Sequence, residues 1–213
     1  SEIEQTFAKH VELLAASKRK SLDYPSRVCL GEYICSAIVH RYLSYHSLDA
    51  VLLDSALCIW TQSWNKALHS AQFHSVIFPK IYQSFLKQKN KILIAQGFIS
   101  SDINSIKKSS NFQRTTLGRE GSDYSAAIFG RMLNVSEVIL FKDVDGIYDT
   151  DPKINSNATF FPKLSYIEAF EICNNGNTVV HPNTIQHLKA KGIPLRIQNF
   201  YDLNKGGTLI TNQ

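Results

Sequence analysis

The stretch TTLGREGSDYSAA at residues 115–127 is the most informative part of this chain, because it places a glycine-bearing loop directly before an apolar, helix-forming run. Glycines allow tight turns and let the backbone approach a ligand closely. A helix beginning at Ser122 directs free N–H groups and the positive end of its dipole at that loop, which favours anions. The guanidinium of Arg119 suits a carboxylate or a phosphate. The stretch predicts a site for a small acid, a phosphorylated ligand or both; the alternative is an ordinary helix cap after a turn.

Composition indicates a globular protein with one sizeable core, alone or with a small appendage. The chain has 213 residues, of which 44% are hydrophobic and 19% charged, and this balance argues against disorder. No apolar run approaches the roughly 18–20 residues that span a bilayer. The first residues have neither the basic lead nor the apolar stretch of a signal peptide. We therefore expect a cytoplasmic protein with no membrane partner.

The cysteines, histidines and basic residues favour neither a metal site nor a nucleic-acid partner. Four cysteines stand among mostly apolar neighbours without the spacing of a zinc site, which predicts buried free thiols: Cys29, Cys35, Cys58 and Cys173. The seven histidines show no metal-ligand spacing either. The net charge of +5 comes with lysine clusters that we interpret as a solvated basic surface. No nucleic-acid-binding motif is present.

Apolar periodicity predicts strands and helices in alternation. The helices are expected over residues 3–18, 30–45, 79–91, 122–133, 166–173 and 182–192. The strands are expected over residues 49–53, 58–61, 92–95, 138–141, 194–197 and 208–210. Residues 100–114 are polar and are predicted to form a flexible loop. Several strands are apolar throughout, so the chain is expected to be an α/β protein with a mainly parallel sheet covered by helices on both faces.

Ligands of such sheets bind beyond the carboxyl ends of the strands, and two polar loops lie there. One follows Ile92–Ala95 and leads to Arg119; the other follows Val138–Phe141 and reads KDVDGIYDTDPK at residues 142–153. In the second loop, Tyr148 could stack on a base and Lys153 could meet a phosphate. The alternative is a well-capped surface turn with exposed lysines. We expect the two loops to converge on one pocket.

Taken together, the motifs resemble the amino-acid kinase family and, within it, the aspartate kinases. The resemblance extends from about Cys29 to the end of the chain, and the stretch at residues 115–127 is its most specific part. DVDGIYDTDPK at residues 143–153 is shared more widely in the superfamily. The remaining matches are GEYICSA at 31–37, QGFIS at 96–100, HPNTI at 181–185 and GGTLI at 206–210.

The resemblance implies a three-layer αβα sandwich with a mainly parallel central sheet, in which residues 1–213 form one kinase domain. It implies transfer of the γ-phosphoryl group of ATP, with Mg²⁺, to the side-chain carboxylate of L-aspartate, a step toward lysine, threonine and methionine. By position, the residues implied to bind the substrate are Glu32, Phe98, Arg119, Ser122 and Asp123, with Arg119 and Asp123 catalytic. Those implied to bind the nucleotide are Lys142, Asp143, Gly146, Tyr148 and Lys153. A homodimer is an allowed assembly.

The chain departs from the family pattern at several positions. It has no Lys-x-Gly-Gly loop at its start, and no regulatory domain follows GGTLI, so the kinase domain is expected to be incomplete at its amino terminus. Thr178 stands where the family carries a phosphate-binding lysine, and Glu120 replaces a glycine. Lys142 replaces a small hydroxyl residue and restores positive charge near the nucleotide.

Two further hypotheses stand beside an aspartate kinase. The first is a kinase-like domain that binds a ligand or partner without turnover, since two phosphate-binding lysines are missing. The second is a sibling kinase that acts on another acid or on a nucleoside monophosphate.

Overall fold

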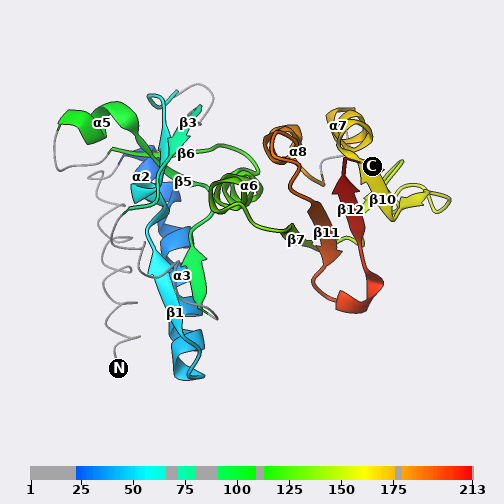
Figure 1. Ribbon diagram of the computed structural model, residues 1–213, viewed down its shortest axis with the longest axis horizontal. Helices are drawn as coiled ribbons and strands as arrows, with labels where there is room; N and C mark the ends of the chain where they lie inside the picture. The colour runs from blue at the N-terminus through cyan, green and yellow to red at the C-terminus, as the bar shows by residue number, and fades with distance from the viewer. Residues whose placement is uncertain (1–22, 66–71, 80–90, 109–112, 176–178, 213) are drawn as a thin grey trace. The chain divides into compact units, whose positions relative to one another are not determined.

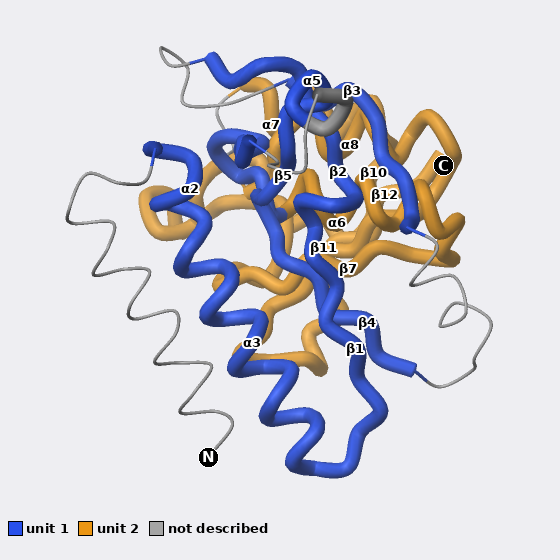
Figure 2. The backbone as a smooth tube through the Cα atoms, turned by 90° about the vertical axis from the view of Figure 1, so that its left-hand side faces the viewer, with its two compact units in different colours: residues 1–122 blue, residues 123–213 orange. Residues whose placement is uncertain are grey.

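The computed structural model describes residues 23–65, 72–79, 91–108, 113–175 and 179–212. The backbone divides into two compact units, residues 1–122 and 123–213, coloured separately in Figure 2. The helix predicted over residues 3–18, the interior of the helix predicted over 79–91, and Thr178 lie outside the described residues.

The long helix of unit 1 is the one that the sequence predicts. It is α3 (Leu30–Tyr45), and it follows the short α2 (Tyr24–Val28), whose first turn is capped by Asp23 through a 3.0 Å bond from the Ser26 N–H. A parallel pair of strands comes next, β1 (Ala50–Leu53) and β4 (Ile92–Ala95), with Ala50 opposite Ile92 (Figure 1). Both strands are confirmed. However, β4 is only partly buried rather than fully buried, with Ile92 37% exposed.

A four-stranded sheet completes unit 1, and it shows that the predicted loop at residues 100–114 is wrong. Its order is β3 (Phe73–Val76), β2 (Ile59–Thr61), β5 (Ile99–Asp102) and β6 (Arg114–Thr116), with the short 3-10 helix η1 (Ser55–Leu57) before β2. Helix α5 (Ile103–Lys108) joins β5 to β6.

Three of the buried polar residues of this sheet bond to one another. The hydroxyl of Thr115 lies 2.6 Å from that of Thr61 and 2.9 Å from that of Ser100, and all three residues are fully buried. Polarity at these positions therefore marks strands with satisfied side chains rather than a solvated loop.

Unit 2 has one four-stranded sheet and a short hairpin. The sheet order is β10 (Lys163–Ser165), β12 (Thr208–Thr211), β11 (Leu195–Asn199) and β7 (Val138–Lys142). The hairpin pairs β8 (Ile147–Tyr148) with β9 (Phe160–Phe161), and the 3-10 helix η2 (Leu203–Lys205) precedes β12. Strand β7 alternates buried and exposed residues, so it is not buried on both faces as its apolar sequence suggests: Ile139 and Phe141 are 41% and 54% exposed.

Three helices accompany this sheet: α6 (Gly121–Leu133), α7 (Tyr166–Asn174) and α8 (Pro182–Lys189), of which α7 and α8 pack against each other (Figure 1). Ser165 begins α7 with a capping box, in which its hydroxyl accepts from the Glu168 N–H and the Glu168 carboxylate accepts from the Ser165 N–H. His181 caps α8 through Nδ1, and that helix ends a few residues earlier than predicted.

Helices and strands alternate as the sequence predicts, and the α/β class is confirmed. The sheets among the described residues are mixed. Every antiparallel pair joins consecutive strands (β2–β3, β5–β6, β8–β9 and β11–β12), whereas the parallel pairs join strands separated by other elements (β1–β4, β2–β5, β7–β11 and β10–β12). Short connections permit only antiparallel pairing, while parallel pairing requires a crossover.

Candidate functional site

The loop after β7 lines a cavity of about 860 Å³ that is formed within unit 2. All five residues that the sequence assigns to the nucleotide contribute to its wall: Lys142, Asp143, Gly146, Tyr148 and Lys153. The rest of the wall comes from Val144, from residues 149–152, and from Phe161, Glu171, Ile172, Asn175 and Val179. A volume of this size is typical of small-molecule and cofactor sites.

The turn at Asp145 and Gly146 is held by polar contacts from the end of the chain. Asp145 accepts hydrogen bonds from Asn199 Nδ2 at 2.7 Å and from Lys205 Nζ at 2.9 Å, and these bonds lower its pKa below the usual range. Gly146 has φ +151°, and a Cβ there would collide with the hydroxyl of Thr208. That hydroxyl accepts from the Ile147 N–H at 2.8 Å and donates to the Phe161 carbonyl. Glycine is therefore required at position 146.

The outer part of the loop is ordered by its own aspartates. Asp149 accepts from the Thr159 N–H at 2.8 Å, which lowers the Asp149 pKa, and Asp151 accepts from the Lys153 N–H at 2.8 Å. Tyr148 is half-buried, with its ring centroid 5.3 Å from that of Phe160. The loop thus presents an aromatic face on a hairpin and an exposed lysine on a capped turn.

Asp123 and Lys142 form a close ion pair within unit 2. Lys142 Nζ lies 2.6 Å from Asp123 Oδ2, and the two side chains are 25% and 12% exposed. Asp123 stands in the first turn of α6, where the helix dipole favours a carboxylate. Lys142 ends β7 and lines the cavity. The structure therefore brings a predicted catalytic acid together with a predicted nucleotide-binding lysine.

The stretch of unit 1 that the sequence predicts to bind an acid is a strained turn followed by a helix start. Gly118 has φ +81°, and Glu120 has φ +56°, a left-handed conformation that favours glycine. The Gly121 N–H donates to the Gly118 carbonyl at 3.0 Å and closes the turn. Arg119 lies on it with an exposed side chain. The guanidinium is thus presented to solvent beside the start of α6.

A second strained turn packs directly on this helix start. Phe98 has φ +68°, and its carbonyl accepts from the Leu117 N–H at 2.9 Å. A Cβ on Gly97 would lie 2.6 Å from Ser122 Oγ, and a Cβ on Gly121 would lie 3.0 Å from the Phe98 ring. The structure therefore brings Phe98 and Ser122 into one corner of unit 1.

Glu32 reaches the same unit from the first turn of α3. It is partly buried, and this burial raises the pKa of its carboxyl. Its neighbour Tyr33 packs with Phe98 on a small core of Cys29, Ala56 and Ile99. The expected convergence of these residues with the nucleotide loop of unit 2 stays a prediction.

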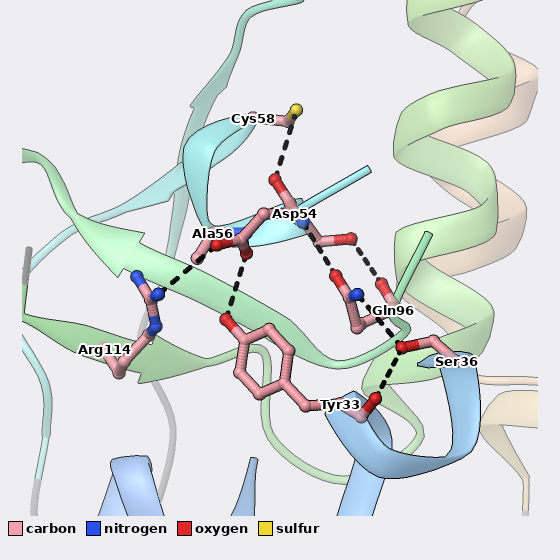
Figure 3. Close-up of polar contacts among 8 residues, drawn as sticks. Tyr33, Ser36, Asp54, Ala56, Cys58, Gln96 and Arg114 are labelled. Carbon is pink, nitrogen blue, oxygen red and sulfur yellow. Dashed lines mark hydrogen bonds and ion pairs between the residues drawn. The ribbon is translucent and has the colours of Figure 1, made fainter. Parts of the chain in front are cut away.

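A partly buried polar network that sequence reasoning missed lies in unit 1 (Figure 3). Asp54 accepts from the Tyr33 hydroxyl and the Ala56 N–H, both at 3.0 Å, and pairs with Arg114 at 3.4 Å. Gln96 is 3% exposed and bonds to two further segments. The one sequence signal was that Asp54 and Gln96 each directly follow an apolar strand.

The thiols are buried with one exception. Cys29, Cys58 and Cys173 are buried as predicted, and burial raises the pKa of Cys29 and of Cys58 to about 12. Cys35 is exposed, contrary to the prediction, because it lies on the outer face of α3. Among the described residues, no group of three or more His, Cys, Asp or Glu side chains could hold a metal ion. No helix in that part of the chain is long and apolar enough to cross a membrane.

Comparison with known proteins relates the whole chain to aspartokinases. An aspartokinase of Chlamydia pneumoniae is 31% identical over 210 residues, which cover 96% of this chain and 42% of that protein. The lysine-sensitive aspartokinase 3 of Escherichia coli is 38% identical over 57% of this chain and 26% of its own length. A bifunctional aspartokinase/homoserine dehydrogenase 2 of Zea mays is 38% identical over 63% of this chain and 14% of its own. The chain thus spans less than half the length of these relatives.

The fold comparison agrees with the sequence comparison. The crystal structure of E. coli aspartokinase III in complex with aspartate and ADP matches all of this chain and 46% of that one, with a TM-score of 0.82 and 28% identity. The same enzyme in complex with lysine and aspartate matches with a TM-score of 0.74. The amino-acid kinase fold that the sequence predicts is confirmed. Since residues 3–199 also match the sequence pattern of the amino acid kinase family, this chain belongs to that family.

Proposed function

We propose that this chain is the kinase domain of an aspartokinase, which transfers the γ-phosphoryl group of ATP to the side-chain carboxylate of L-aspartate. The observation that carries the proposal is that all five residues of the nucleotide loop line one cavity of about 860 Å³. The similarity to aspartokinases, one of them crystallised with aspartate and ADP, supports the choice of substrates.

The nucleotide half has the groups that ATP requires. Tyr148 offers a ring face to the base, and Lys142 and Lys153 offer ammonium groups to the phosphates. Position 146 has no room for a side chain beside Thr208, so glycine allows the turn to pack closely there. Tyr148, Lys142 and Lys153 bind and orient the nucleotide.

The same wall fits Mg²⁺ carried in with the nucleotide. Asp143, Asp149 and Asp151 line the cavity and would offer carboxylate oxygens, the hard ligands that Mg²⁺ prefers. Mg²⁺ is usually held by one or two carboxylates together with substrate phosphates, so it needs no dense protein cluster. When bound, it would neutralise phosphate charge.

The acid half has groups for both ends of aspartate. Arg119 would pair with a carboxylate, and the helix start at Ser122 would offer N–H groups to an anion. Glu32 would bind the amino group of aspartate. The positive charge of that group would favour the ionised carboxylate and so oppose the effect of burial, which raises the Glu32 pKa. Phe98 would close one side. Asp123 would hold Lys142 in place, so the chemistry is mainly positioning and charge neutralisation.

The test is an assay of ADP release coupled to aspartyl hydroxamate formation, on the full-length natural protein with L-aspartate and Mg-ATP. Turnover is expected, with a large loss in Arg119→Ala and Lys153→Ala. Lys163→Ala, which changes an exposed lysine outside the cavity wall, is the matched control and should retain activity. ADP binding by calorimetry without turnover would reject the proposal in favour of a non-catalytic binding domain. A panel of other acids and nucleoside monophosphates would reveal a sibling kinase.

The expectations of a cytoplasmic location and of a homodimer stay predictions. Size-exclusion chromatography with light scattering on the full-length protein tests the second of them.

A further inference from the structure

We propose that Gln96 is a positioning residue for the acid site, and this inference rests on the proposed function. Gln96 directly follows β4 and is 3% exposed. Its side-chain carbonyl accepts from the Ser55 N–H at 2.9 Å, and its side-chain amide donates to Ser36 Oγ at 3.0 Å (Figure 3). Its backbone carbonyl accepts from Ser55 Oγ at 2.6 Å. One residue thus joins three segments that are 41 and 60 positions apart in the sequence.

The first of these segments carries Glu32. Ser36 lies one helical turn after Glu32 on α3, and its hydroxyl donates to the Tyr33 carbonyl at 3.1 Å while it accepts from Gln96. The hydroxyl has one proton, so the Gln96 amide must be the donor in its bond to Ser36. Gln96 therefore fixes the position of the first two turns of α3 relative to the end of β4.

The second segment is the turn that continues from Gln96 itself. Gly97 and Phe98 follow it, with Phe98 in a left-handed conformation against the start of α6. A shift of the Gln96 backbone would move Phe98 and press Gly97 into Ser122, since no space remains between them. The Ser55 bonds to both carbonyls of Gln96 oppose that shift. Gln96 therefore sets the spacing between Glu32 on one side and Phe98 with Ser122 on the other.

If Gln96 has this role, changing it should affect the binding of aspartate and not the binding of ATP. The cavity assigned to the nucleotide is lined only by residues of unit 2, whereas every bond of Gln96 lies in unit 1. A misplaced Gln96 should raise KM for aspartate and leave KM for ATP unchanged. A purely structural role would instead lower stability without separating the two constants.

The experiment uses Gln96→Met, Gln96→Glu and Ser36→Ala in the full-length protein. Gln96→Met removes donor and acceptor at similar size, Gln96→Glu keeps the acceptor, and Ser36→Ala removes one bond with the smallest change. Losing one buried hydrogen bond corresponds to about a tenfold rise in KM for aspartate. The Ser36→Ala effect should disappear in the Gln96→Met background, because the two changes remove the same bond.

Ser101→Ala is the matched control, since the Ser101 hydroxyl is buried in unit 1 and has no hydrogen-bond partner among the residues that the structure describes. It should leave both KM values unchanged. An unaltered KM for aspartate in Ser36→Ala and in both Gln96 variants, or an equal rise in both KM values, overturns the inference while the proposed function stands. Absence of aspartate phosphorylation in the wild type overturns both.

Discussion

Replacing Lys142 by threonine should weaken the kinase in two measurable ways. The Lys142–Asp123 pair is 2.6 Å long and is neither exposed nor fully buried, with side-chain exposures of 25% and 12%. Exposed pairs contribute about 0–1 kcal/mol and broken buried pairs cost about 3–5 kcal/mol, so we expect a loss of about 2 kcal/mol in the free energy of unfolding. The helix dipole still stabilises Asp123, which keeps the loss below the buried limit.

The catalytic effect should be larger than the structural one. A donor aimed at developing charge is worth about 3 kcal/mol, so kcat of Lys142→Thr should fall by about 100-fold or more. Urea unfolding measures the first quantity, and the coupled ADP-release assay at saturating substrates measures the second. Lys142→Arg, which keeps the charge, is the control and should recover much of kcat and most of the stability.

The result that would refute this reasoning is a Lys142→Thr protein that unfolds more readily but keeps kcat and KM for ATP within about twofold of the wild type. Lys142 would then serve only to hold Asp123. A double variant that also carries Asp123→Asn separates the cases, because a purely structural pair loses nothing further at the second step.

Three other changes test separate features. Burial and Arg131 lower the pKa of His187 from 6.5 to about 4, so between these pH values the unfolded state binds a proton that the folded state does not. The free energy of unfolding should therefore be highest above pH 6.5 and fall as the pH drops from 6.5 through 4. The slope should be shallower in His187→Gln. Glu120→Gly removes the strain of a side chain in the left-handed conformation. It should raise the free energy of unfolding by about 0.5 kcal/mol, after subtracting the entropic cost of glycine, and lower KM for aspartate. A destabilised variant would show that Glu120 is not strained. Gly146→Ala should cost at least about 2 kcal/mol and abolish ATP binding by calorimetry, because its Cβ collides with Thr208; near-native binding would show that the turn can relax.

The parts of the fold that the sequence predicts correctly depend on neighbours along the chain. Helix α3 follows from apolar spacing, and α7 follows from the capping pair of Ser165 and Glu168, three residues apart. The predicted loop at residues 100–114 failed for the opposite reason. Thr115 is buried between the hydroxyls of Ser100 and of Thr61, which lies 54 residues away, and no local pattern encodes the contact with Thr61.

In the candidate site, too, the residues found from the sequence are those that lie close together along the chain. The residues predicted to bind the nucleotide lie within twelve positions of one another, so a single motif points to them, and the structure places all of them on one wall. The network of Asp54, Gln96 and Arg114 escaped prediction because its bonds join positions 41 and 60 residues apart. Sequence patterns find residues that face a ligand, while the residues that hold them in place are found only through the folded contacts.

The charge on the cavity wall has a consequence for the form of nucleotide that can enter. Its two lysines stand against four carboxylates, those of Asp143, Asp149, Asp151 and Glu171, which gives the wall a formal charge of −2 when all are ionised. A bare triphosphate carries about four negative charges and would be repelled by such a wall at low salt. In the proposed function the nucleotide should therefore enter with its charge already reduced by a divalent cation, and metal-free ATP should compete poorly with the complex.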